Sequence, residues 1–156
     1  MLPTYADDVS VVSIHGAHGV LARRCFSPGE MILQLKGELR SQPDRYTIQL
    51  DDDLHIASDA TGPGGRPSWR YINHACEPNT YVRGRELLAA HAVLSGDELT
   101  FNYNTTEYDM ASPFNCHCGS PQCAGQICGF RHLADAEKQR LRPLLAPHLL
   151  RRLDRT

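Results

Sequence analysis

The chain has 156 residues, and its six cysteines are too few for a disulfide-stapled secreted domain. With 41% hydrophobic and 22% charged residues, the composition is that of a folded globular protein, which excludes wholesale disorder. The formal net charge of -2 lacks the basic excess of a nucleic-acid-binding domain, so we expect no direct nucleic acid partner. A mildly acidic protein of this length fits a single domain that meets a basic peptide.

Nothing in the sequence indicates a targeting or membrane segment. The first ten residues hold two aspartates, no basic residue and no apolar run of signal-peptide length. The uncharged stretch from Pro113 to Phe130 holds four cysteines and a histidine, which hydrocarbon would not accept. We therefore expect a soluble, intracellular protein with no membrane partner, and the sequence leaves open whether it is cytoplasmic, nuclear or delivered to a host.

From Val9 to about Thr105, short apolar runs alternate with Gly, Pro and Asp, which predicts a mainly β fold with few long helices. The segment from Ser58 to Ser68 has three glycines and two prolines and predicts an irregular surface loop, either covering a substrate or merely connecting. The expected strands are 11–14, 19–22, 31–35, 46–50, 54–56, 79–82, 87–93 and 98–103.

The segment from His132 to Leu153 changes character. It is rich in Leu, Ala and Arg, and its leucines recur at helical spacing until Pro143 and Pro147 interrupt them. This pattern predicts two short helices that pack back on the sheet.

Three stretches carry the chemistry: RYINHACEPN at 70–79, GDELTFNY at 96–103 and CHCGSPQC at 116–123. In this order they resemble the SET-domain protein lysine methyltransferases with a cysteine-rich post-SET tail. The resemblance implies a SET-domain fold, with small curved sheets and a knot-like C-terminal threading. It implies a SET domain over 1–110, a post-SET zinc segment over 111–130 and a C-terminal helical tail over 131–156.

The implied activity is transfer of methyl groups from S-adenosylmethionine to a lysine of a protein substrate, a histone or another basic protein. The alternative is an inactive SET-like scaffold that binds a peptide or a protein partner. A thiol redox protein is a third interpretation, which the lack of a C-x-x-C pair disfavours.

Cys116, Cys118 and Cys123 form C-x-C-x4-C, three soft thiolate ligands on a loop with a glycine and a proline to bend it. Tetrahedral zinc needs a fourth ligand. The resemblance implies Cys76, while Cys128 is a purely local rival and four reduced thiols without metal are the remaining alternative.

The resemblance also implies the cofactor pocket. Asn73 and His74 are expected to contact S-adenosylmethionine, with Arg70 and Tyr71 lining the same pocket. A histidine considered alone would more often be structural.

The second cofactor element of the family is a G-x-G turn near the start of the domain. Here the sequence is HGAHGVLA, with Gly16 and Gly19 separated by two residues and Ala17 in the usual place of the first glycine. Gly19 and Val20 match the second glycine and the apolar residue after it. A tight hairpin is the alternative role for these glycines.

Tyr103 stands in the position of the family's catalytic tyrosine. Methyl transfer is an in-line displacement that needs a neutral amine, and neutralising a lysine of pKa about 10.4 at neutral pH costs roughly 4 kcal/mol. An apolar channel and the cofactor cation both lower that pKa, so no side-chain base is obligatory. Tyr103 is expected to orient the amine and to give electrostatic stabilisation, the alternative being an exposed tyrosine at a strand end.

Phe101 is expected on the same strand face as Tyr103, and by resemblance a phenylalanine there implies room for more than one methyl group. Two departures from the family stand nearby: Leu35 replaces a frequent tyrosine, and Asn102 replaces the more usual aspartate.

For the substrate, the acidic turn 51–53 is expected to form a rim for a basic peptide bound as an added strand, together with Asp97, Glu98 and Glu107. A solvated turn is the simpler alternative for the three aspartates.

Overall fold

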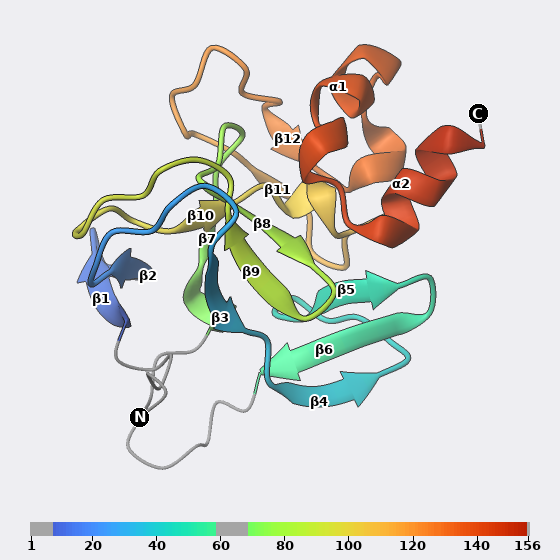
Figure 1. The fold of residues 1–156 in the computed structure, drawn as a ribbon. Coiled ribbons are helices and arrows are strands. Elements are labelled where there is room, and N and C mark those ends of the chain that lie inside the picture. Colours follow the sequence, from blue (N-terminus) through green and yellow to red (C-terminus); the bar gives the residue numbers. More distant parts are fainter. Residues whose placement is uncertain (1–7, 59–68, 156) are drawn as a thin grey trace.

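The computed structural model describes residues 8–58 and 69–155. The predicted loop from Ser58 to Ser68 therefore lies, apart from Ser58, outside the described residues. In chain order (Figure 1) the elements are β1 (Val9–Ile14), β2 (Ala17–Ala22), β3 (Met31–Gln34), β4 (Gly37–Arg40), β5 (Ile48–Asp51), β6 (Leu54–Ser58), η2 (Trp69–Tyr71), β7 (Asn73–His74), β8 (Thr80–Arg83), β9 (Glu86–Ala89), β10 (Thr100–Phe101), η3 (Tyr103–Thr105), β11 (Phe114–Asn115), β12 (Gln126–Ile127), η4 (Phe130–His132), α1 (Asp135–Arg140), η5 (Arg142–Leu144) and α2 (Pro147–Asp154).

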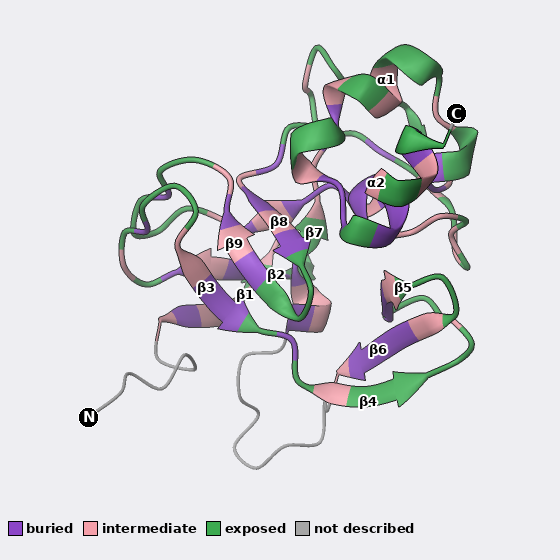
Figure 2. Cartoon of the chain, turned by 45° about the vertical axis from the view of Figure 1, so that its right-hand side comes forward, coloured by how far each residue is buried: buried purple, intermediate pink, exposed green. Residues whose placement is uncertain are grey.

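The mainly β fold is confirmed. Within the described ranges the strands form three two-stranded sheets and two three-stranded sheets, ordered β3-β9-β8 and β4-β6-β5. Figure 1 shows the small sheets grouped together, with the C-terminal helices α1 and α2 gathered beside them. Burial agrees with this arrangement in Figure 2, where β6 and β9 carry buried residues and β4 is mostly exposed.

The β1–β2 hairpin explains the irregular glycine spacing near the start of the chain. Ile14 pairs with Ala17, so His15 and Gly16 form a two-residue turn, and both have positive φ, 49° and 79°. Paired positive φ values are typical of the type I′ turns that match strand twist. Gly16 thus closes the hairpin, and β2 begins two residues earlier than the expected strand.

Parallel pairing of β7 with β10 brings two of the chemical stretches together, with Asn73 opposite Thr100 and His74 opposite Phe101.

The strand expected over 98–103 is much shorter, because the Asn102 side chain accepts the backbone N–H of Asn104 at 3.0 Å. That capping bond turns the chain into the 3-10 turn η3 immediately before Tyr103. Tyr103 therefore begins a turn and does not end a strand.

The two predicted C-terminal helices are confirmed, with η5 between them. They enclose a core of their own, and α2 also packs against β5. That core consists of Phe130, Leu141, Leu145, Leu149 and Leu153.

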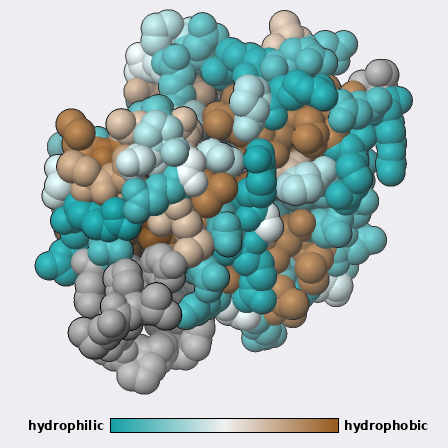
Figure 3. Space-filling model, viewed as in Figure 1, coloured by the Kyte–Doolittle hydropathy of each residue, from teal (hydrophilic) through white to brown (hydrophobic). Residues whose placement is uncertain are grey.

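Figure 3 shows apolar residues on one face in separate patches divided by hydrophilic ones. Over residues 8–58 and 69–155, no helix is long and apolar enough to cross a membrane.

Candidate active site and cysteine cluster

A cleft of about 800 Å³ collects the chemical stretches. Its walls come from the start of β2, the turn before β5, the segment from η2 to β7, the η3 turn and the segment that leads into the cysteine loop. Of the predicted site residues, those on its lining are Arg70, Tyr71, Asn73, His74, Phe101, Tyr103, Cys116 and Cys118.

Tyr103 is held rigidly at this cleft. Its hydroxyl donates to the Ile72 carbonyl oxygen at 2.7 Å, and the ring centres of Phe101 and His74 lie 4.8 and 5.3 Å from its own. Burial, reinforced by the charges of Glu107 and Glu98, raises the pKa of the Tyr103 hydroxyl. The hydroxyl therefore stays neutral and can act only as a dipole and hydrogen-bonding group.

His74 has both ring nitrogens engaged within the protein. Nδ1 accepts the backbone N–H of Tyr103 at 3.0 Å, so the proton of the neutral ring is on Nε2, which lies 3.3 Å from Cys76 Sγ. Burial lowers the pKa of His74 to about 4, which keeps the ring neutral. His74 thus links the Tyr103 turn to the cysteine cluster, and both of its ring nitrogens are used within the protein.

Asn73 connects the other side of the cleft. Its Nδ2 donates to the His18 carbonyl oxygen at 2.9 Å and to Glu98 Oε2 at 2.8 Å. Asn73 therefore ties β2 to β7 while remaining exposed on the cleft.

The expected cofactor contacts of Gly19 and Val20 stay predictions. Gly19 and Val20 are not on the cleft lining, and Val20 is buried in the core. Sequence reasoning missed Ala17 and His18, which line the cleft from the same strand, and the ring centre of His18 lies 4.9 Å from that of Tyr71. Recognising the turn at His15 and Gly16 in the sequence could have predicted these two positions, because this turn makes β2 begin at Ala17, earlier than the usual glycine spacing implies.

Leu35, in the place of a frequent tyrosine of the family, is 1% exposed and belongs to the core. It does not line the cleft.

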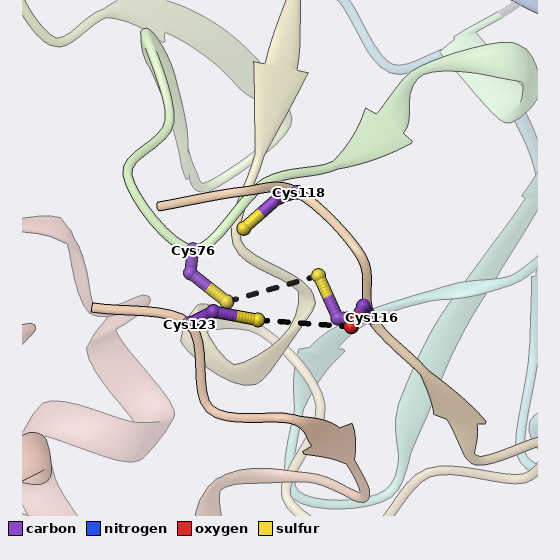
Figure 4. A group of neighbouring side chains, drawn as sticks. All are labelled: Cys76, Cys116, Cys118 and Cys123. Atoms are coloured by element: carbon purple, nitrogen blue, oxygen red, sulfur yellow. Dashed lines mark hydrogen bonds between the residues drawn. The ribbon is translucent and has the colours of Figure 1, made fainter. Parts of the chain in front are cut away.

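Four sulfur atoms converge beside the cleft. The Sγ atoms of Cys76, Cys116, Cys118 and Cys123 all lie within 4.8 Å of one another, and Figure 4 shows Cys76 approaching from a separate segment of the chain. The Cys76 and Cys116 sulfurs are 3.9 Å apart, whereas a tetrahedron with Zn–S bonds of 2.3 Å has edges of about 3.8 Å. Cys128 is outside this group.

Three of the four thiols have shifted acidities. Burial raises the pKa of Cys76 and of Cys116, whereas backbone hydrogen bonds lower the pKa of Cys118 to about 7. The thiols must lose their protons to bind a metal, so metal affinity at this cluster falls as the pH is lowered.

The acidic turn does not border the cleft as expected. Asp51 and Asp52 pair with Arg151 and Arg152 of α2, at 2.7 and 3.3 Å, so the chain's own basic helix partly neutralises the charge of the turn, which stays exposed. The prediction of a peptide rim at residues 51–53 receives no geometric support, because none of the three lines the cleft.

Glu107 is also not a surface rim residue. It is partly buried on the cleft lining, where its Oε2 accepts the backbone N–H of Gln49 at 2.9 Å and the Thr106 hydroxyl at 2.6 Å. Burial raises the pKa of Glu107 to about 7, and these two hydrogen bonds only partly oppose the increase. The sequence carried no indication of this environment.

Glu107 is expected to make the stability of the protein depend on pH. Its pKa rises from 4.5 in the unfolded chain to about 7 in the folded one, so the folded chain binds an extra proton between these values. The free energy of unfolding should fall by up to about 3 kcal/mol as the pH rises from 4.5 to 7, and Glu107→Gln should lose this dependence. Urea unfolding of both proteins across this range would measure it, and parallel pH curves would contradict the expectation.

Comparison with known proteins is consistent with this geometry. A family described as "SET domain" matches residues 17–104. A protein of Aspergillus fumigatus named "Histone-lysine N-methyltransferase, H3 lysine-36 specific" is 43% identical over 146 residues, covering 80% of this chain and 15% of that protein. A protein of the same name from Coccidioides immitis is 35% identical over 133 residues, covering 72% of this chain and 13% of that protein.

One solved structure with the same fold is described as "crystal structure of KRYPTONITE in complex with mCHH DNA, H3(1-15) peptide and SAH". The TM-score is 0.58 at 20% identity, over 76% of this chain and 29% of that chain. This chain thus spans a small part of much longer proteins. The expectation that nucleic acid is not a partner receives no support from these comparisons.

Proposed function

This chain belongs to the SET domain family, and from that premise we propose that it transfers methyl groups from S-adenosylmethionine to a lysine side chain of a histone or another basic protein. The observation that carries the proposal is the convergence of Tyr103, the Asn73–His74 pair and the cysteine cluster at one cleft. The named relatives are histone-lysine methyltransferases, so an inactive scaffold is not favoured.

The cleft fits the proposed methyl donor. Its volume of about 800 Å³ is within the range of small-molecule sites, and the exposed Asn73 amide and the Tyr71 ring provide polar and stacking contacts. Ala17 and His18 would approach the donor from β2, and Arg70 from η2. The donor supplies an electrophilic methyl group bound to a sulfonium sulfur.

The protein's own contribution is to orient and desolvate the amine. Tyr103 is fixed by its bond to the Ile72 carbonyl, so its hydroxyl dipole needs no reorganisation when the amine arrives. Phe101 and Phe114 pack near the Tyr103 ring and exclude water from the channel. Water exclusion favours the neutral form of the lysine, which is the form that can accept a methyl group.

We further propose that Cys76, Cys116, Cys118 and Cys123 hold a structural zinc ion. Four thiolates at nearly tetrahedral spacing are the donor set that zinc prefers, and they leave no open position for chemistry. The ion would fasten the cysteine loop against the segment that carries His74. His74 would then donate its Nε2 proton to the Cys76 thiolate as an outer-shell contact.

The direct test of the function uses the zinc-loaded protein, labelled S-adenosylmethionine and purified histones. Label should appear on lysine, as mass spectrometry of digested histones would identify. Binding of S-adenosylmethionine without transfer to histones or to a cell extract would instead support the inactive scaffold. A histone substrate would place the protein with chromatin.

Phe101→Tyr is expected to shift the products toward monomethyl-lysine. The Phe101 ring is 4.8 Å from that of Tyr103, so a hydroxyl added there can hold a partly methylated amine or the water beside it. One extra hydrogen bond is worth about 1 kcal/mol, which would lower the share of higher methylation about fivefold to tenfold. Mass spectrometry of a methylated peptide would measure the shift, and an unchanged product distribution would remove Phe101 from this role.

A further inference from the structure

The proposed reaction releases a proton, which either water or a side chain at the cleft can receive. The substrate lysine arrives as an ammonium ion and must become an amine before it can attack the methyl group. Among the candidates on the described cleft lining, His18 and His117 are exposed imidazoles, whereas Asp44 and His74 are already engaged. Asp44 Oδ1 accepts the backbone N–H groups of Tyr46 and Thr47 while its Oδ2 binds Arg40, and both ring nitrogens of His74 are occupied.

Glu107 differs from these groups because half of its carboxylate is free. Both hydrogen bonds to this carboxylate fall on Oε2, from Gln49 and Thr106. Oε1 accepts no hydrogen bond from the described residues. The fully buried side-chain atoms that lack a partner do not include Oε1, so this oxygen is not fully buried. Since Glu107 lines the cleft, we take Oε1 to be the oxygen that is open to it.

Glu107 also belongs to the same turn as Tyr103. Its backbone N–H donates to the Tyr103 carbonyl oxygen at 3.0 Å, and its carboxylate is second only to burial in raising the pKa of the Tyr103 hydroxyl. Gln49 Oε1 accepts the backbone N–H of Tyr108 at 2.9 Å, so β5 is fastened to this turn at two points. The carboxylate is therefore held in place between the turn and β5.

The charges around Glu107 suit a proton acceptor at neutral pH. Its pKa of about 7 leaves it ionised in part at pH 7, ready to accept a proton and able to release it again. Glu98 and Arg45 act on Tyr103, and His148 of α2 contacts the Thr106 carbonyl oxygen next to Glu107. The cleft lining adds the titratable residues His18, Asp44, Arg70 and His117. The pKa of His148 is lowered by burial, so it adds no positive charge that would compete for Glu107.

We propose that Glu107 takes the proton that the substrate ammonium loses before methyl transfer, directly or through one water. An N–H bond of the ammonium breaks, its electron pair stays on nitrogen as the lone pair, and an O–H bond forms on Glu107 Oε1. The amine then accepts the methyl group, and Glu107 releases its proton to solvent before the next round. This inference rests on the proposed function and adds the proton acceptor to it.

Glu107→Gln tests the inference because glutamine keeps an oxygen for Gln49 and Thr106 but cannot take a proton at neutral pH. We expect kcat at pH 7 to fall about 100-fold or more, with S-adenosylmethionine affinity nearly unchanged. The loss should shrink as the pH rises toward 9, because solvent then removes the proton. Glu38→Gln, on the exposed strand β4, removes the same charge away from the cleft and should retain the wild-type pH profile.

A second measurement does not depend on turnover. In protein labelled with carbon-13 at glutamate carboxyl carbons, a lysine peptide should lower the pH at which the Glu107 resonance titrates, because an ammonium ion beside the carboxylate favours its ionised form. The same peptide with norleucine in place of lysine should not. An unchanged titration with the lysine peptide, or wild-type kcat in Glu107→Gln, would overturn the inference, whereas a wild-type protein that transfers no methyl group would overturn the proposed function.

Discussion

Tyr103→Phe should lower kcat by about 10²- to 10³-fold while leaving S-adenosylmethionine affinity nearly unchanged. The hydroxyl is the only part removed, and it donates to the Ile72 carbonyl oxygen at 2.7 Å on the cleft wall. Without it the amine loses its orienting dipole at the moment when charge moves from sulfur to nitrogen. Single-turnover kinetics with saturating peptide would measure the chemical step, and calorimetry would measure cofactor binding.

Tyr81→Phe is the matched control, because it removes a hydroxyl from β8, outside the cleft lining. It should keep wild-type kcat. Full activity in Tyr103→Phe would exclude the hydroxyl from the mechanism. Equal losses of cofactor affinity and rate would indicate that Tyr103 shapes the donor site rather than the transfer step.

Cys76→Ser should strip zinc from the protein and destabilise the cysteine loop by several kcal/mol. A complete structural zinc site contributes on the order of 10 kcal/mol to the folding of small domains, and removal of one of four thiolates loses a large part of this. Because Cys76 comes from the segment next to His74 and the other three sulfurs come from the loop, the mutation would also separate the loop from the cleft. Metal analysis and thermal unfolding would measure both effects.

Two controls separate the proposed zinc ligands from the other cysteines. Cys128→Ser should retain a full zinc complement, because Cys128 lies outside the four-sulfur group, and so should Cys25→Ser at an exposed position. Full metal content in Cys76→Ser together with loss in Cys128→Ser would reverse the assignment. A chelator should reproduce the Cys76→Ser phenotype in the wild-type protein.

Local sequence patterns were sufficient for much of the fold. Alternation of short apolar runs with turn residues predicted a mainly β chain, and leucine spacing predicted both C-terminal helices. The predicted ends of strands were wrong where a side-chain hydrogen bond turned the chain, as when the Asn102 side chain ended the strand before Tyr103. Such a capping bond depends on one residue and its local geometry, which a pattern of apolar residues does not register.

The residues of the candidate site were likewise predicted only in part. Co-occurring short motifs indicated Tyr103, the Asn73–His74 pair and the cysteines, since these residues carry distinctive chemistry at short spacing. Ala17 and His18 were missed because the hairpin turn at Gly16 shifted the strand against the expected spacing.

By itself, the sequence determined which chemical groups the protein has: a tyrosine, an asparagine–histidine pair and a set of thiols in short recognisable stretches. Only the tertiary structure decided what surrounds them, including the arginines of α2 that pair with the acidic turn and the position of Glu107 on the cleft lining. The reason is physical: the bond between Gln49 and Glu107 joins residues 58 positions apart. Such a contact depends on how the whole chain packs, and burial and pKa result from that packing rather than from neighbouring residues.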